Sequence, residues 1–114
     1  EWTVQDILVH CIDTERVFAY RALRIARGDT TALPGFEQDD YIAPANANQR
    51  ELQDILDEYQ AVRNATITLF QTFDESILMN STLTSGHRTT LRALMYILTG
   101  HELHHYVSIQ ENYG

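Results

Sequence analysis

Apolar residues recur at three- and four-residue steps along three long stretches of the chain, which predicts three amphipathic helices. The first helix is expected from Thr3 to about Arg27. Thr3 and Asp6 have the spacing of a capping box, and Gly28 is a natural stop because glycine readily adopts the left-handed conformation that ends helices. This helix carries a broad apolar arc, so we expect it to be buried along one face.

The other two stretches predict helices in the second half of the chain. One opens at Asn48, where Glu51 completes an N-terminal capping pattern, and continues to about residue 73. The last is capped by Thr89 or Thr90 and runs to about Asn112. Both have an apolar stripe at helical spacing, which indicates that each packs against a shared core.

The segments between these helices are polar and contain turn-forming residues. Residues 28–47 form a long connection that we expect to be an ordered crossover covering one end of a bundle, held by aromatic residues such as Phe36 and Tyr41. Residues 80–88 are expected to be extended or looped, with a turn at Gly86 and an exposed His87. The pattern therefore predicts one all-α domain over residues 1–114.

The composition restricts the classes of partner. The chain has 16 acidic residues, eight Lys plus Arg and a net charge of −8, so it repels phosphate backbones and we expect no nucleic-acid partner. No apolar run approaches the length of a membrane span, and no signal peptide is visible. The single cysteine, Cys11, excludes an internal disulfide. We expect a cytoplasmic protein that does not associate with membranes.

Three histidines suggest a metal centre. His101 and His105 are four residues apart, so on a helix their rings project from one face, where they continue the apolar stripe. His10 lies at the border of the first helix's apolar arc, a position that faces the interior yet reaches solvent. Three imidazoles with an open coordination position are typical of a catalytic zinc. The alternative is that these histidines are hydrogen-bonded core residues, and the adjacent Cys11 is expected to be a core residue rather than a ligand.

Other side chains offer further chemistry. Residues 101–105 match the pattern H-E-x-x-H, in which Glu102 would be the general base of a zincin-like hydrolase. For a domain this small, a second role is that Glu102 supports the ligating histidines. Arg21, three turns along from His10, is a candidate anchor for an acidic group on a substrate, and Tyr41 or Phe36 is a candidate for the pocket mouth.

Several segments together resemble the DinB/YfiT-like superfamily, which is distinct from the DNA polymerase that shares the name. Residues 2–16, WTVQDILVHCIDTER, are similar to its segment W-S-x-x-E-V-L-x-H-x-x-D-x-E-R. Residues 96–105, YILTGHELHH, are similar to its final-helix G-H-E-x-x-H segment. Residues 21–29, 33–36 and 62–66 add to the resemblance, which covers nearly the whole chain.

The resemblance implies an up-down four-helix bundle with long crossovers, and the family's first helix is apparently absent from this chain. It also implies a divalent metal, zinc or nickel, held by His10, His101 and His105. Such proteins include thiol-dependent S-transferases and hydrolases, so the expected partners are a small-molecule thiol or electrophile and a second copy in a homodimer. The alternative function is a non-catalytic helical module for stress response or protein interaction.

Overall fold

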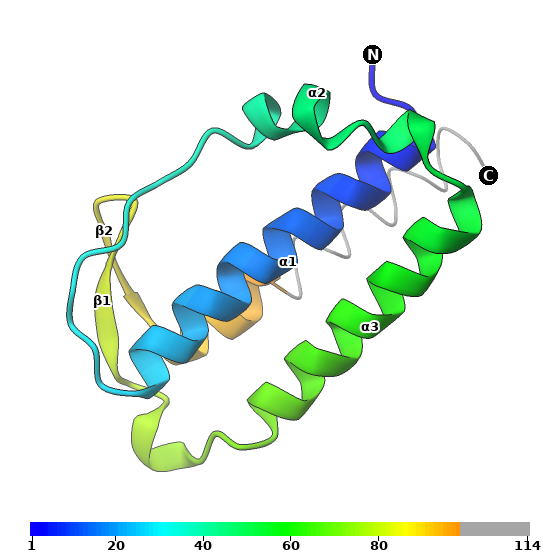
Figure 1. Cartoon of the computed structure of the whole chain (residues 1–114). Coiled ribbons are helices and arrows are strands. Elements are labelled where there is room, and N and C mark those ends of the chain that lie inside the picture. The colour runs from blue at the N-terminus through cyan, green and yellow to red at the C-terminus, as the bar shows by residue number, and fades with distance from the viewer. Residues whose placement is uncertain (99–114) are drawn as a thin grey trace.

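The computed structural model describes residues 1–98, which are mostly helical (Figure 1). Helical residues 91–98 follow the last strand. None of the described helices is long and apolar enough to cross a membrane. The elements that precede residue 91 are, in chain order, α1 (Val4–Ala26), η1 (Gln38–Tyr41), α2 (Ile42–Ala45), η2 (Ala47–Gln49), α3 (Leu52–Phe70), η3 (Glu75–Ile77), β1 (Ser81–Thr84) and β2 (His87–Thr90).

Both ends of α1 confirm the signals in the sequence. Thr3 Oγ1 accepts a hydrogen bond from the N–H of Asp6 at 3.1 Å, and the Asp6 carboxylate accepts one from the N–H of Thr3 at 3.0 Å, which completes the capping box. At the other end, Gly28 has a φ of 79°, a conformation that glycine adopts without steric cost. The N–H of Asp29 then donates to the carbonyl of Arg24 at 3.0 Å, as in a Schellman motif.

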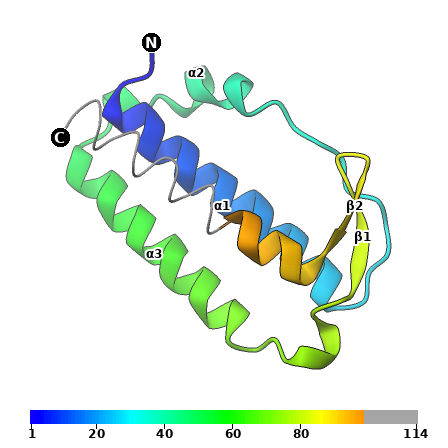
Figure 2. The ribbon, with the colours of Figure 1, turned by 180° about the vertical axis from the view of Figure 1, so that it is seen from behind.

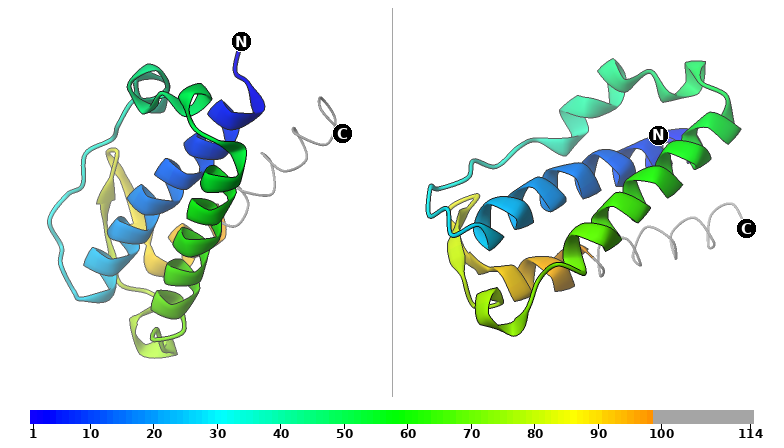
Figure 3. Two further views of the ribbon diagram at one scale, coloured as in Figure 1. Left: turned by 45° about the vertical axis from the view of Figure 1, so that its right-hand side comes forward. Right: turned by 60° about the horizontal axis from the view of Figure 1, so that its bottom comes forward.

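The connection after α1 is ordered, as predicted, but it runs back along α1 instead of covering one end of the bundle (Figure 3). Its three short helices, η1, α2 and η2, all contact α1. Near its start, Leu33 forms a parallel bridge with Thr84, and the N–H of Leu33 donates to the carbonyl of Leu83 at 2.7 Å. α1 is therefore flanked by the connection on one side and by α3 on another.

Asn48 does not cap the second long helix, so that prediction was wrong. Asn48 lies in η2, where its side chain binds the first turn of α1. Thr3 Oγ1 donates to Asn48 Oδ1 at 2.6 Å, and Asn48 Nδ2 donates to Asp6 Oδ1 at 3.3 Å. α3 begins after Glu51, whose backbone is extended and whose side chain makes no capping bond. Long-range hydrogen bonds have replaced the local cap.

α1 and α3 run in the same direction (Figure 1). The connection returns the chain to the N-terminal end of α1, so both helices start at the same end of the molecule. Their common core contains Val9 and Ile12 from α1 and Ile55 and Val62 from α3. A simple up-down arrangement would make these two helices antiparallel, so the described helices support a helical fold without confirming the four-helix bundle type.

A short β-hairpin lies between η3 and the last helical segment, so the fold is not purely α-helical as the sequence pattern predicted. β1 and β2 are antiparallel and begin by pairing Ser81 with Thr90. Ser85 and Gly86 both have positive φ, 51° and 84°, which suits a two-residue hairpin turn. His87 is exposed, as predicted.

Helical residues 91–98 pack on the C-terminal half of α1 (Figure 2). Thr90 caps this segment, as predicted, because its Oγ1 accepts a hydrogen bond from the N–H of Ala93 at 3.0 Å. Leu91 and Leu94 are buried in one cluster with Ile25 of α1. The predicted continuation to about residue 112 lies outside the described residues.

Candidate metal centre and neighbouring cavities

His10 lies in the N-terminal half of α1 and is only 3% exposed. The indole of Trp2 packs against its ring, with 5.0 Å between the ring centroids and 53° between the ring planes. The sequence predicted a border position with access to solvent, whereas the structure buries this side chain. A histidine held in this way by its surroundings is a suitable metal donor in its neutral form.

The other two predicted ligands, His101 and His105, lie outside the described residues, as does Glu102. That the three imidazoles converge on one metal ion therefore stays a prediction. Within residues 1–98, no cluster of three or more His, Cys, Asp or Glu side chains is arranged to hold a metal ion.

Thr14 follows His10 by one turn of α1 and shares its face of the helix. The side chain is 2% exposed, and its Oγ1 has no hydrogen-bond partner in the part of the chain that the structure describes. A buried threonine in a helix commonly donates to the carbonyl four residues before it, as Thr66 does to Val62 at 3.1 Å. Within residues 1–98 the Thr14 hydroxyl is therefore an unsatisfied buried polar group, one helical turn from His10.

Glu15 and Arg63 form a salt bridge between α1 and α3, which sequence analysis missed. Glu15 is 4% exposed; Arg63 Nη2 donates to its Oε1, while its Oε2 has no hydrogen-bond partner among the described residues. The sequence did contain a signal. Glu15 follows Cys11 by four residues and precedes Phe18 by three, so it shares the apolar stripe and must face the core.

Cys11 is a buried core residue, as predicted. Burial raises the pKa of its thiol to about 12, and the nearby charge of Glu15 adds to the effect. Burial likewise raises the pKa of Tyr59 to about 12. Both groups stay protonated near neutral pH, so neither is a ready nucleophile or base.

Arg21 and Tyr41, the two predicted substrate-binding residues, line one cavity of about 400 Å³ between α1 and the connection. Phe36 lines it too, and its ring lies 5.3 Å from that of Tyr41. A volume of this size is within the range of small-molecule sites. The complete lining is Val17, Tyr20, Arg21, Arg24, Leu33, Pro34, Gly35, Phe36 and Tyr41.

Arg21 is 7% exposed and is held by aromatic rings and one carbonyl. Its guanidinium carbon lies 5.4 Å from the ring centroid of Phe18 and 5.7 Å from that of Phe36. Its Nη2 donates to the carbonyl oxygen of Pro34 at 2.8 Å. Burial lowers the pKa of Arg21, although an arginine remains charged at neutral pH.

The Arg21 cavity is separate from the candidate metal ligand. Arg21 lies eleven positions after His10 in continuous α1, which corresponds to about 16 Å along the helix axis. A compact molecule held by Arg21 therefore does not also reach the His10 ring. The expected role of Arg21 as an anchor for a substrate at the metal requires an extended ligand.

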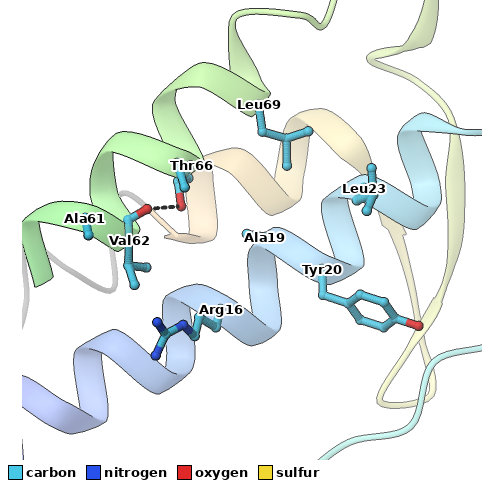
Figure 4. A pocket seen from close by; sticks show the side chains of 9 residues that line it. Arg16, Ala19, Tyr20, Leu23, Ala61, Val62, Thr66 and Leu69 are labelled. Atoms are coloured by element: carbon cyan, nitrogen blue, oxygen red, sulfur yellow. Dashed lines mark hydrogen bonds between the residues drawn. The ribbon is translucent and has the colours of Figure 1, made fainter. Parts of the chain in front are cut away.

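A second cavity of about 440 Å³ lies in the groove between α1 and α3. Figure 4 shows Val62 and Leu69 pointing from α3 toward α1, whereas Tyr20 points away from α3. The groove is mostly aliphatic, and the described residues that line it include no carboxylate, histidine or cysteine. Its lining residues are Arg16, Ala19, Tyr20, Leu23, Ala61, Val62, Ala65, Thr66 and Leu69.

The comparisons with known proteins agree with the helical fold and with the resemblance seen in the sequence. A family model described as the DinB superfamily matches residues 1–109. Neither the curated proteins nor the solved structures give a significant match. The family match spans nearly the whole chain and includes His10, His101 and His105. The chain therefore belongs to the DinB superfamily.

Proposed function

We propose that this DinB-superfamily protein binds a divalent metal, zinc or nickel, through His10, His101 and His105. The observation that carries the proposal is the burial of His10 on α1 beside the unsatisfied hydroxyl of Thr14. Imidazole nitrogen donors suit both zinc and nickel. The sequence pattern supports the other two ligands, because His101 and His105 continue the spacing of the buried leucines in residues 91–98.

We further propose that the protein is an enzyme that activates a small-molecule thiol, or water, against a small electrophile. A bound divalent metal would supply Lewis acidity and lower the pKa of a thiol or water. Burial keeps the Cys11 thiol protonated near neutral pH, so in this proposal a reacting thiol belongs to a substrate and not to Cys11. Trp2 restricts the orientation of His10, and the Thr14 hydroxyl is available to hydrogen-bond a group that binds beside it.

Metal content measured by elemental analysis tests the ligand assignment. The untagged chain, purified without chelator, is expected to contain one divalent metal per chain. His10→Ala and His101→Ala should each reduce this content at least about tenfold, since removal of one of three ligands destroys the site. His87→Ala is the matched control, because His87 is an exposed histidine on β2. Full metal retention by His10→Ala, or equal loss by His87→Ala, would contradict the assignment.

A cobalt-substituted sample separates an enzyme from a structural metal site. If one coordination position is open, addition of 2-mercaptoethanol should produce a new thiolate-to-cobalt absorption band. An unchanged spectrum would favour the non-catalytic interaction module. Glu102→Gln tests the zincin-like alternative: loss of ester or peptide hydrolysis with intact metal content would favour a hydrolase in which Glu102 is the base.

A further inference from the structure

Arg21 is buried, and its charge environment differs from that of the four arginines that form ion pairs in the described part of the chain. Among the described residues, Arg21 contacts no carboxylate, although the chain carries 16 acidic residues. A buried charge without a counter-ion is costly, and an opposite charge relieves that cost. The arginines that do contact a carboxylate are Arg16, Arg24, Arg50 and Arg63.

The residues of the cavity wall leave most N–H donors of the Arg21 guanidinium available to a ligand. The carbonyl of Pro34 is the one hydrogen-bond acceptor of the Arg21 guanidinium in the described part of the chain. A guanidinium has five N–H donors, so most of them are left for another partner. Arg24, which also lines the cavity, is neutralised by Asp29 at 2.7 Å. Of the two arginines that line the cavity, Arg21 is therefore the one without a carboxylate partner among residues 1–98.

The remaining wall suits an apolar body. Phe36 and Tyr41 form a tilted aromatic pair at one side, and Tyr20 lies at another. Tyr20 and Tyr41 are 55% and 43% exposed, so the cavity reaches the molecular surface between them. The site thus combines a buried positive charge with exposed aromatic rings, a pattern typical of sites for small amphipathic acids.

We propose that this cavity binds a small molecule with one carboxylate and an aromatic or apolar body, and that Arg21 receives the carboxylate. A planar carboxylate matches the fork of guanidinium donors. A singly charged anion is favoured over a phosphate dianion, because the net charge of −8 repels the dianion more strongly. The site uses described residues only and does not depend on the proposed metal.

The competing explanation is purely structural. In that view Arg21 only fastens the connection to α1, through the carbonyl of Pro34 and the ring of Phe36. A fastening role predicts that substitution of Arg21 lowers stability without changing ligand binding. An anion-receiving role predicts a change in affinity that depends on the charge of the ligand.

A ¹⁹F NMR titration of the full chain separates these two roles. The probes are 4-fluorobenzoate and its neutral analogue 4-fluorobenzyl alcohol. Fluorobenzoate should bind saturably and at least about tenfold more tightly than the alcohol, because a charge-assisted hydrogen bond contributes more than a neutral one. Equal affinities, or no saturable binding of fluorobenzoate, would overturn the proposal.

Two arginine variants with the same change in charge localise the site. Arg21→Met should weaken fluorobenzoate binding about tenfold, whereas Arg27→Met, an exposed position at the end of α1, should not change it. Equal affinities of the two variants would overturn the assignment. If Arg21→Met does not fold, Tyr41→Ser decides: weaker binding supports the site, and unchanged binding contradicts it.

Two further experiments test the preference for a carboxylate and the independence of the site from a metal. Phenyl phosphate should bind more weakly than fluorobenzoate; tighter binding would contradict the preference for a carboxylate. The titration should also be the same with and without EDTA. Binding that disappears with EDTA would place the anion on a metal and overturn the proposal, whereas unchanged binding with lost metal keeps the two sites distinct.

Discussion

The guanidinium of Arg63 reaches across from α3 and donates to the carboxylate of Glu15 on α1, 48 residues earlier in the chain. This ion pair joins the two parallel helices near the middle of their interface. The Glu15 side chain is 5% exposed and the Arg63 side chain 28% exposed, so the pair is shielded from solvent mainly at its acidic end. Removal of Arg63 would therefore leave a buried carboxylate without a counter-ion, whereas removal of Glu15 would leave a guanidinium that is partly exposed to solvent.

Arg63→Met is expected to destabilise the fold by about 3 kcal/mol, because it leaves the Glu15 carboxylate buried without a counter-ion. Urea unfolding followed by circular dichroism measures the change. Arg16→Met is the matched control: it breaks the exposed pair with Glu58, which should cost no more than about 1 kcal/mol. A smaller loss in Arg63→Met than in Arg16→Met would contradict the buried character of the pair.

The double variant Glu15→Gln/Arg63→Met should recover part of the stability that Arg63→Met loses. The glutamine keeps the shape of Glu15 and removes the charge that needed compensation. The same urea experiment completes a double-mutant cycle, in which the two changes should be clearly non-additive. Additive losses would mean that Glu15 and Arg63 stabilise the protein independently.

Neighbouring positions of α3 test which of its faces is buried. Ile55 is 0% exposed and Leu56 is 42% exposed, although both belong to the predicted apolar stripe. Ile55→Ala should cost about 2–5 kcal/mol because it leaves a cavity between α1 and α3. Leu56→Ala should cost less than about 1 kcal/mol. Thermal unfolding of the two variants measures both effects, and a reversed order would contradict the orientation of α3.

The ends of α1 were predictable because their signals are local. Thr3 and Asp6 are three residues apart, and Gly28 takes up its left-handed conformation directly after the helix. The Thr90 cap is local in the same sense. Each of these features depends on a few neighbouring residues, so it is visible in the sequence without knowledge of the tertiary fold.

The features that sequence analysis missed depend on contacts between distant segments. Asn48 has a capping residue's chemistry, but its side chain binds Thr3 and Asp6 instead. The turn at Gly86 was predicted, but the pairing of the two strands was not, because strands of four residues are too short to show a clear periodic pattern.

The candidate sites show the same division between local and long-range information. His10 was identified from its place on α1, whereas its burial under Trp2 was not. Arg21 was identified as a candidate from its position three turns along from His10, and Tyr41 as an aromatic residue of the long connection. Their meeting in one cavity follows from the connection folding back along α1, which no periodic pattern encodes.

The reactivity of Cys11 tests whether the buried face of α1 is shielded from solvent. Burial and the charge of Glu15 raise the pKa of its thiol to about 12, so at pH 8 only about one molecule in ten thousand carries the reactive thiolate. The native chain should therefore react with iodoacetamide far more slowly than the chain unfolded in urea. Mass spectrometry counts the single modification. Equal rates in the two states would contradict the burial of this thiol.

The stability of the protein should depend on acid pH through Asp29, which lies just beyond α1. The N–H of Thr31 and the guanidinium of Arg24 donate to its carboxylate and lower its pKa from 3.8 to about 2. A folded-state pKa below the unfolded value means that the stabilisation is complete above about pH 4 and is lost as the pH falls toward 2. Asp29→Asn removes this dependence, so its thermal midpoint should change less than that of the wild type across this interval. Asp39→Asn is the control: it removes an exposed carboxylate from η1 and should keep the wild-type pH profile. If Asp29→Asn and the wild type have the same profile, the Asp29 carboxylate is not bound by Thr31 and Arg24 as described.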